Sequence, residues 1–427
     1  MKTLLVSSYH PELVRGGAQQ VAYDLFKSLQ EMPGMEPVLL CSSHYDVPPV
    51  FSQGARIVAF DGRRDEYLFL SHGYDYVQHR LPDPAQAQAF AAFLLNTNPD
   101  VVHFHHFMTY GVDYLTLTRR ILPKARIIFT AHDFLSLCAN KGLMQRTKED
   151  APCASASPVR CYQCFPQRRP EDFFLRQRWM QTHLAAADKI TVPSRFMLPV
   201  FAAWGIEPDR LVHVPNGIAC APAPVLPVRA HPYRFGFFGQ LVDAKGVGLL
   251  FDAVALLRAE GFVGFEVEVN GDNLHFSSPE TRAFIEAFLA AEAQRPLAAQ
   301  LVRFNGGYHH SQLASRMGQI DWVVAPSLWR EAFGLVVSEA WHFGRPVIVP
   351  HQGGPAERVK EDENGLLFEM GNVRSLAQTM RRAASEPGLW DRLVAGIEQP
   401  TSCAEMCAGY AAVYRPSDKP VRKKQSV

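Results

Sequence analysis

Two glutamates, Glu331 and Glu339, flank a glycine turn in the stretch PSLWREAFGLVVSEAWHFGRPVIVP. Seven residues separate them, so we expect Glu331 in a loop and Glu339 one turn into the helix that follows. At about 1.5 Å per helical residue, the two carboxylates lie up to ~12 Å apart. This exceeds the roughly 5 Å at which two carboxylates flank the bond cleaved by a retaining glycosidase. The pair therefore predicts contacts to separate parts of one long ligand, such as a nucleotide-sugar.

The turn between the glutamates, Phe333–Gly334–Leu335, could receive the phosphates of such a ligand. Backbone N–H groups at a helix start, together with the helix dipole, favour an anion, and glycine lets a diphosphate approach closely. A second contact is predicted at Lys245, which precedes a helix in DAKGV and can place its ammonium against the diphosphate. For isolated residues, the alternatives are a helix-capping glutamate and a surface lysine.

This segment resembles the E-x7-E signature of the retaining, nucleotide-sugar-dependent glycosyltransferases related to glycogen and sucrose synthases, the group 1 or family-four enzymes. Further stretches resemble the same family, in the same order along the chain: SSYHPELVRGGAQQVAYDL, FTAHDF, HVPNGI and FGFFGQLVDAKGVGLLFDAV. Together the matches span nearly the whole chain. Each short loop alone is a weak signal, whereas the ordered set is a specific one.

The resemblance implies a role for each matching residue. Glu339 would hydrogen-bond the ribose of the donor, and Glu331 would lie near the transferred sugar. His132, in FTAHDF, would position or polarise the donor sugar or the acceptor hydroxyl, with a satisfied core histidine as the alternative. The loop of Gly16 and Gly17 would close the ligand cleft from the first domain.

One position departs from the family pattern. The family usually has an arginine in a G-R-L triplet, where it partners the lysine on the diphosphate, and this chain has Gln240. A neutral amide can donate a hydrogen bond but brings no charge. Lys245 and the helix start after Gly334 would therefore carry more of the electrostatics, and Arg15 or Arg330 could compensate.

No D-x-D pair occurs in the chain, so the usual two-aspartate device for holding a divalent ion on a nucleotide diphosphate is absent. We therefore expect prearranged donors, not a metal ion, to stabilise the departing nucleoside diphosphate. The resemblance implies retention through a same-face, oxocarbenium-like displacement, in which the leaving phosphate takes the acceptor's proton.

Short apolar runs such as TLLVSS, RIIFTAH, FEVEVNG and PVIVP alternate with longer amphipathic stretches. The runs are typical of buried parallel strands, and Val21, Leu25 and Leu29 form one apolar stripe of a helix over 18–29. An α/β fold with two doubly wound sheets follows. The resemblance implies the GT-B fold, in which two Rossmann-like domains face a central cleft, with ligands at the carboxyl ends of strands.

The predicted domains follow from the strand pattern and the resemblance. Residues 1–218 form an acceptor-binding Rossmann-like domain, 219–232 a linker rich in proline and alanine, and 233–398 a nucleotide-sugar-binding Rossmann-like domain. By resemblance, a helix within 399–415 returns to the first domain. Residues 416–427 form a basic tail.

Four cysteines, Cys138, Cys153, Cys161 and Cys164, cluster in an insertion of the first domain at about 138–164. Such clustering in a cytosolic chain favours zinc over disulfides, and four thiolates satisfy tetrahedral coordination. Structural zinc is therefore our hypothesis. The alternatives are four free thiols, a redox pair at Cys161 and Cys164, or an iron–sulfur cluster.

Bulk composition narrows the class of protein. With 427 residues and 47% hydrophobic content, the chain can form two domains with their own cores. A net charge of +1 argues against a nucleic-acid-coating surface. We find no signal-peptide pattern and no run of 18 apolar residues. We therefore expect a cytoplasmic protein.

The stretch FPQRRPEDFFLRQRWM, residues 165–180, interleaves arginines with aromatic side chains. We interpret it as a solvated helix face. The alternative is contact with an anionic lipid-linked acceptor or with the inner face of a membrane, as a peripheral protein makes.

The sequence thus predicts a retaining glycosyltransferase that moves a sugar from a nucleotide-sugar donor to a glycan or lipid-linked saccharide, in surface polysaccharide or lipopolysaccharide assembly. No cofactor is expected for catalysis. One alternative is another GT-B enzyme, such as a nucleotide-sugar epimerase. The other is a catalytically silent sugar-nucleotide-binding assembly protein, which the neutral Gln240 favours and the intact Glu331, Glu339, Lys245 and His132 oppose.

Overall fold

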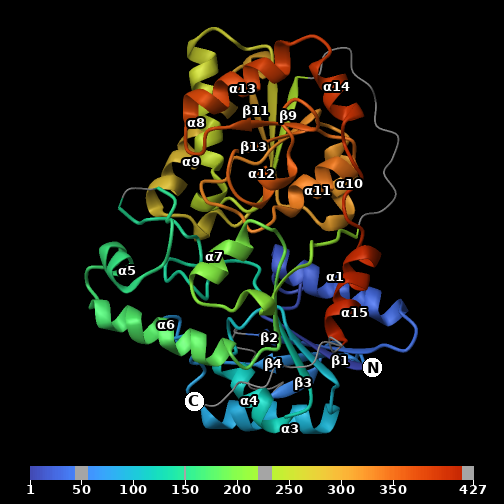
Figure 1. Cartoon of the computed structure of the whole chain (residues 1–427). Coiled ribbons are helices and arrows are strands. Elements are labelled where there is room, and N and C mark those ends of the chain that lie inside the picture. Colours follow the sequence, from blue (N-terminus) through green and yellow to red (C-terminus); the bar gives the residue numbers. More distant parts are fainter. Residues whose placement is uncertain (44–55, 149–150, 220–232, 416–427) are drawn as a thin grey trace. The chain divides into compact units, whose positions relative to one another are not determined.

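The computed structural model (Figure 1) describes residues 1–43, 56–148, 151–219 and 233–415. The predicted linker, except Ala219, and the predicted basic tail lie outside these residues. Internal contacts divide the chain into two compact units. The first unit comprises Met1–Thr130, Gln181–Thr191 and the segment from Ser402, and the second comprises Ala131–Met180 and Val192–Thr401.

The first sheet has the strand order β3-β4-β2-β1-β5-β6-β7-β8. Its strands are β1 (Lys2–Ser7), β2 (Glu36–Ser43), β3 (Ile57–Ala59), β4 (Glu66–Leu70), β5 (Val101–Phe104), β6 (Arg126–Thr130), β7 (Lys189–Val192) and β8 (Leu211–His213). The central strand β1 pairs in parallel with β2 and β5, whereas the short β3 runs antiparallel to β4. All of β1 after Lys2 is buried, as expected for a parallel strand covered on both faces.

The helices of the first unit are α1 (Gly17–Glu31), α3 (Pro84–Thr97), α4 (Asp113–Ile121) and α15 (Cys403–Tyr414). The predicted apolar stripe of α1 is confirmed, because Val21, Leu25 and Leu29 are all fully buried. Helix α15 begins with a capping box between Ser402 and Glu405. Its Tyr414 hydroxyl hydrogen-bonds His103 Nδ1 at 2.8 Å, which ties the helix to β5.

The second sheet has the order β11-β10-β9-β12-β13-β14, and all its strands run parallel. The strands are β9 (Arg234–Phe238), β10 (Glu266–Asn270), β11 (Val302–Gly306), β12 (Trp322–Val324), β13 (Val347–Pro350) and β14 (Gly365–Phe368). Side chains alternate between the two faces of a strand. Accordingly, Trp322 and Val324 join one hydrophobic core, and Val323 joins another.

The second unit is rich in helices, several of which cover the two faces of this sheet. Its helices are α5 (Pro158–Cys164), α6 (Pro170–Leu184, whose last residues belong to the first unit), α7 (Met197–Ala203), α8 (Val247–Ala259), α9 (Pro279–Ala293), α10 (Leu313–Met317), α11 (Leu335–His342), α12 (Gly354–Arg358), α13 (Val373–Ser385) and α14 (Leu389–Ala395). In Figure 1, α8, α9 and α13 lie on one side of the second sheet, and α10 and α11 lie on the other. This is the predicted doubly wound arrangement.

Candidate active site

Lys245 and Glu331, which the sequence assigns to one ligand, contact each other directly. Lys245 Nζ donates a hydrogen bond to Glu331 Oε1 at 2.7 Å, across 86 residues of sequence. Lys245 ends a 3-10 turn (Asp243–Lys245) after β9, and Glu331 follows β12. Since β9 and β12 are neighbours in a parallel sheet, their carboxyl ends bring the two loops together.

Glu331 is held as a carboxylate. Its side chain is only 7% exposed, and burial alone would raise its pKa. The charge and hydrogen bond of Lys245, a hydrogen bond from Ser327 and the charge of Arg358 outweigh burial, and they lower the pKa below the ordinary value. The Lys245 ammonium and the Ser327 hydroxyl both donate to Oε1. Oε2 accepts no hydrogen bond from any described residue, so it can accept one from a ligand.

The contact between the two loops requires a glycine at position 246. Gly246 has φ +70°, and a Cβ there would lie 1.9 Å from the carbonyl oxygen of Pro326. Next to it, Leu328 N donates to Ala244 O at 2.9 Å. Gly246 therefore lets the lysine loop lie against the loop that leads to Glu331.

Helix α11 begins close to Glu331, and the backbone N–H groups at its start make no hydrogen bond with the described residues. Its N-cap is Gly334, with φ +74°. The N–H groups of Phe333, Gly334 and Leu335 donate to no acceptor among residues 1–43, 56–148, 151–219 and 233–415. Free amides at a helix start form an anion site, so the geometry fits the phosphate contact predicted for this turn.

Arg358 sets the orientation of these amides, and sequence reasoning missed it. Its guanidinium donates to the carbonyl oxygens of Phe333 and Gly334 and to Ser338 Oγ, and it lies 3.8 Å from the Phe333 ring centroid. In a planar trans peptide, C=O and N–H point in opposite directions. The N–H groups of Gly334 and Leu335 therefore point away from Arg358.

Burial lowers the pKa of Arg358 to about 10, while the charges of Glu357 and Glu331 oppose that shift. The guanidinium is thus still charged at neutral pH. It adds a positive charge near Glu331 that the sequence motifs do not reveal. The one signal in the sequence is that Arg358 is a basic residue four positions after Gly354, where it ends helix α12.

Two hydrogen bonds hold the backbone of the Glu331 loop, and a further contact joins the two segments that make them. Gly354 N donates to Glu331 O at 2.7 Å, and Ser194 Oγ donates to Ala332 O at 2.6 Å. The Glu357 carboxylate accepts from the backbone N–H groups of Arg195 and Phe196 at 2.9 and 2.8 Å. The loop is therefore fixed from α12 and from the segment that precedes α7.

Three other predicted site residues also belong to the second unit. Glu339 lies within α11 and is half-buried, one turn after the helix start as expected. Gln240 follows β9, and His132 follows β6 by two residues and is half-buried. Their roles stay predictions.

The remaining predicted site residues are two glycines of the first unit and the two arginines that could compensate for the neutral Gln240. Gly16 is the N-cap of α1, and Gly17 is its first residue. Their part in closing a cleft stays a prediction, as does any part of Arg15. Arg330 is half-buried and donates to Cys153 O of the cysteine-rich segment through Nη2, and its part in binding a diphosphate stays a prediction.

The structure gives the zinc hypothesis no support. All four thiols of Cys138, Cys153, Cys161 and Cys164 are free, and no group of three or more His, Cys, Asp or Glu side chains in the described part of the chain could hold a metal ion. Burial raises the pKa of the Cys138 thiol, and that of Cys161 to about 11. The charges of neighbouring thiols add to both shifts, that of Cys153 at Cys138 and those of Cys138 and Cys153 at Cys161, and structural zinc stays a hypothesis.

Comparisons with known proteins agree with the fold. A family model described as Glycosyltransferase Family 4 matches residues 15–221, and one described as Glycosyl transferases group 1 matches residues 232–386. A phosphatidyl-myo-inositol mannosyltransferase of Propionibacterium freudenreichii is 35% identical over 192 residues, which cover 43% of this chain and 44% of that protein. The matched part thus spans less than half of that relative.

Solved structures extend the likeness over almost the whole chain. Anabaena HepE, in complex with UDP and glucose, superposes with a TM-score of 0.64 at 16% identity and covers 97% of this chain and 99% of its own. Sucrose-phosphate synthase of Thermosynechococcus elongatus superposes with a TM-score of 0.70 at 17% identity, covering 97% and 98%. These likenesses confirm the predicted fold class, GT-B. The chain belongs to the group 1 and family-four glycosyltransferases.

Proposed function

We propose that the chain is a retaining, metal-independent glycosyltransferase that moves a sugar from a nucleotide-sugar donor to a glycan or lipid-linked saccharide. The observation that carries the proposal is the juxtaposition of the Lys245–Glu331 ion pair with the free amides of Phe333, Gly334 and Leu335. A cation and three amides suit a diphosphate, and the adjacent carboxylate suits sugar hydroxyls. The complex of Anabaena HepE with UDP and glucose supports this class of donor.

In the proposed binding step, the helix-start amides receive the diphosphate and Lys245 turns from Glu331 toward it. The Lys245 side chain is 33% exposed, so it has room to move. Glu331 keeps the hydrogen bond from Ser327 and the nearby charge of Arg358, and it accepts a hydroxyl of the transferred sugar at Oε2. By resemblance, Glu339 binds the ribose, His132 orients the sugar or the acceptor, and Gln240 donates a neutral hydrogen bond to the diphosphate.

In the proposed transfer step, negative charge grows on the departing nucleoside diphosphate. Lys245 and the oriented amides meet that charge with donors already in place, which is the main source of catalysis in such sites. The glycosidic carbon–oxygen bond to phosphate breaks, and the acceptor oxygen bonds to the same carbon from the same face. The acceptor's proton goes to the leaving phosphate, and the sugar keeps its anomeric configuration.

We propose no cofactor for this chemistry. Group 1 glycosyltransferases of GT-B fold generally need none for catalysis. The absence of a D-x-D pair and the supply of positive charge by Lys245 and Arg358 support leaving-group stabilisation by the protein's own groups.

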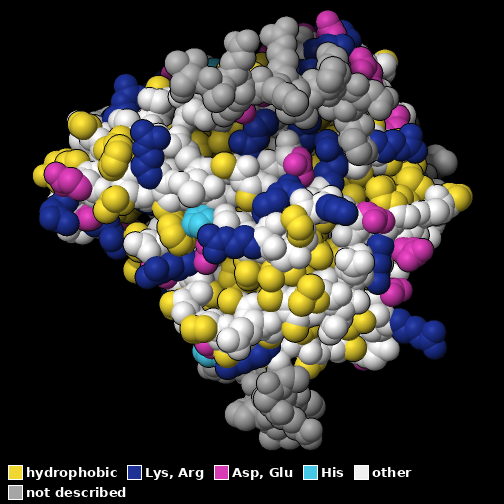
Figure 2. Space-filling view, turned by 60° about the horizontal axis from the view of Figure 1, so that its bottom comes forward, with side chains coloured by type: hydrophobic (Ala, Val, Ile, Leu, Met, Phe, Trp, Pro, Cys, Tyr) yellow, Lys and Arg dark blue, Asp and Glu magenta, His cyan; other side chains and the backbone are white. Residues whose placement is uncertain are grey.

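We propose a lipid-linked or surface-polysaccharide acceptor, reached by peripheral contact with the inner face of the membrane. The apolar side chains Val159 and Leu175, on α5 and α6, are each 62% exposed, and Tyr162 and Phe174 are exposed beside them. Exposed arginines lie on these helices and in the turn between them, namely Arg160 on α5, Arg168 and Arg169 in the turn, and Arg178 on α6. Figure 2 shows hydrophobic and basic side chains close together at its left, on the side where Figure 1 has α5 and α6.

Exposed apolar side chains with arginines on the same segment suit an anionic lipid surface. None of the helices in the described residues has the length and apolarity needed to cross a bilayer. The name of the Propionibacterium relative, a phosphatidyl-myo-inositol mannosyltransferase, supports a lipid-linked acceptor.

Donor turnover tests the proposal. We would incubate the protein with UDP-, GDP- and ADP-sugars and follow nucleoside diphosphate release and the anomeric configuration of any product by NMR. Release with a retained configuration is expected. Nucleotide-sugar binding without turnover across many acceptors would favour the silent assembly protein, and an inverted product would contradict retention.

A further inference from the structure

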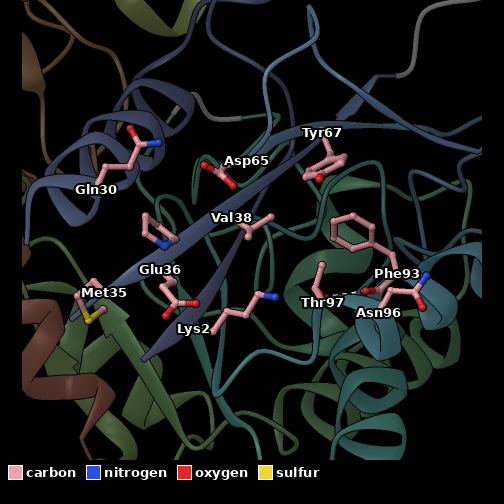
Figure 3. A pocket seen from close by; sticks show the side chains of 11 residues that line it. Lys2, Gln30, Met35, Glu36, Val38, Asp65, Tyr67, Phe93, Asn96 and Thr97 are labelled. Atoms are coloured by element: carbon pink, nitrogen blue, oxygen red, sulfur yellow. Dashed lines mark hydrogen bonds between the residues drawn. The ribbon is translucent and has the colours of Figure 1, made fainter. Parts of the chain in front are cut away.

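A hollow of about 790 Å³ lies in the first unit, at the amino ends of its strands (Figure 3). We call it the amino-edge groove, and the residues that define it are Lys2, Glu36, Asp65, Tyr67, Phe93 and Asn96. Lys2 and Glu36 begin β1 and β2 and are direct partners in the parallel register. The carboxyl ends, where α/β sheets usually bind ligands, lie at the opposite edge of this sheet. The volume falls within the ~300–1,000 Å³ of small-molecule sites.

An aromatic pair forms one end of the amino-edge groove. The rings of Tyr67 and Phe93 meet edge to face, with centroids 5.1 Å apart and an interplanar angle of 69°. Both residues are half-buried, and the Tyr67 hydroxyl is fixed by a 2.8 Å hydrogen bond to Arg64 O. Figure 3 shows the two rings together at one end and Gln30 and Met35 at the other. Electron-rich ring faces attract the C–H groups of a sugar ring.

Polar side chains without partners line the groove between these ends. The ammonium of Lys2, the carboxylates of Glu36 and Asp65 and the amide of Asn96 make no hydrogen bond or ion pair with any described residue. Backbone donors are already used there, because Lys2 N donates to Asp100 Oδ2 and Glu36 N donates to Met1 O. A ligand would therefore be recognised by side chains and not by strand pairing.

The composition of the groove selects among ligand classes. One lysine against two carboxylates disfavours phosphates and nucleic acids, because their binding needs an excess of positive charge. The charged and amide side chains of the lining disfavour an apolar ligand. Sugar hydroxyls both donate to carboxylates and accept from an ammonium or an amide. A neutral, hydroxyl-rich ligand with apolar ring faces therefore matches both the polar side chains and the aromatic end of the groove.

We propose that the amino-edge groove binds a neutral oligosaccharide and holds part of a glycan chain away from its reacting end. That the bound chain is an acceptor or product of this protein rests on the proposed function. The binding itself rests on the groove alone.

Affinity electrophoresis tests the groove directly. The full chain is run in native gels that contain glycogen, yeast mannan or dextran, and we expect at least one polymer to retard it. Phe93→Ala should weaken the retardation at least tenfold, because it removes one ring of the pair. Glu36→Gln should weaken the retardation several-fold, and because Glu36 is exposed, this change should not disturb folding.

The matched control is Leu95→Ala, which removes a side chain that is 61% exposed on the same helix and does not line the groove. It should migrate like the unmodified chain. Failure of all three polymers to retard the protein would overturn the proposal. Retardation that survives Phe93→Ala and Glu36→Gln unchanged would overturn it as well.

Donor turnover, measured in parallel, separates this proposal from the proposed function. Phe93→Ala should leave nucleoside diphosphate release with a short acceptor unchanged. Polysaccharide binding without any donor turnover would refute the proposed function but not the proposal that the groove binds an oligosaccharide. Donor turnover without polysaccharide binding would refute only the proposal that the groove binds an oligosaccharide.

Discussion

The Glu331 loop and the amino-edge groove are both rich in polar side chains, but they differ in how those side chains are held. In the loop, Lys245 and Ser327 donate to Glu331, and Arg358 and Ser194 bind the backbone carbonyls. In the groove, the carboxylates of Glu36 and Asp65 meet no partner among the described residues.

Under the two proposals, this difference corresponds to two kinds of recognition. A site that stabilises growing charge gains most from dipoles fixed before the reaction. A site for a neutral, hydroxyl-rich ligand can leave its groups to be satisfied by the ligand, and it then binds more weakly because it must order them. Perturbing the fixed region should therefore have larger effects than perturbing the open one.

The largest effect is expected at the ion pair. Glu331→Gln and Lys245→Ala should each lower the sugar-transfer rate on the order of a hundredfold or more, because donors and acceptors at such sites contribute that much. Steady-state kinetics measures the loss, and circular dichroism checks that the variants fold. The control is Lys360→Ala, which removes a lysine from an exposed pair with Glu398. Transfer close to the unmodified rate in either site variant would refute the site.

The next effect concerns the glycine between the loops. Gly246→Ala should lower the free energy of unfolding by about 2–4 kcal/mol, since it combines left-handed backbone strain with a clash against Pro326 O. Gly261→Ala is the matched control, because Gly261 has φ +76° and a Cβ added there would meet nothing within 4 Å. Its cost should be only about 1 kcal/mol. If urea unfolding gave equal losses of unfolding free energy for the two variants, the Lys245 loop and the loop leading to Glu331 would not need this close contact.

A smaller effect should follow from changing the arginine that orients the amides. Arg358→Lys keeps the charge but cannot bind two carbonyls and a hydroxyl in one fork. We expect nucleotide affinity to fall roughly tenfold, about 1.4 kcal/mol, as measured by calorimetry. Arg392→Lys, at an exposed surface pair, should leave the affinity unchanged. Unchanged affinity in Arg358→Lys would mean that the amides are oriented without it.

The smallest effect is a dependence of stability on pH. The pKa of Glu331 is lowered in the folded protein, so this carboxylate stabilises the fold above its unfolded pKa, and the contribution is lost as pH falls through the folded pKa. Urea unfolding at about pH 7 and about pH 4 should show a larger acid loss for the unmodified chain than for Glu331→Gln. Equal losses would contradict the charged state assigned to Glu331.

Much of the fold could be predicted from local patterns. Apolar runs such as TLLVSS and PVIVP form parallel strands, and Val21, Leu25 and Leu29 bury one face of α1. Motifs alone assign Lys245 and Glu331 to one ligand, and the parallel order of β9 and β12 explains why they meet.

What the sequence could not supply depends on tertiary placement. Arg358 acts through carbonyls 24 and 25 residues away, which no local spacing reveals. Cysteine spacing suggests zinc, and it carries no information on the burial that raises the pKa of the Cys138 and Cys161 thiols. The contact between the Arg330 guanidinium and Cys153 O joins residues 177 apart, and no motif indicates it.

Nucleotide binding tests the central claim most directly. Thermal unfolding would be followed with UDP, GDP, ADP and CMP, since a ligand that binds only the native state raises the melting temperature. We predict that one nucleotide selectively stabilises the unmodified chain and that Lys245→Ala loses most of this shift. No shift with any of the four nucleotides, or an equal shift in Lys245→Ala, would contradict a diphosphate site at Lys245 and the start of α11.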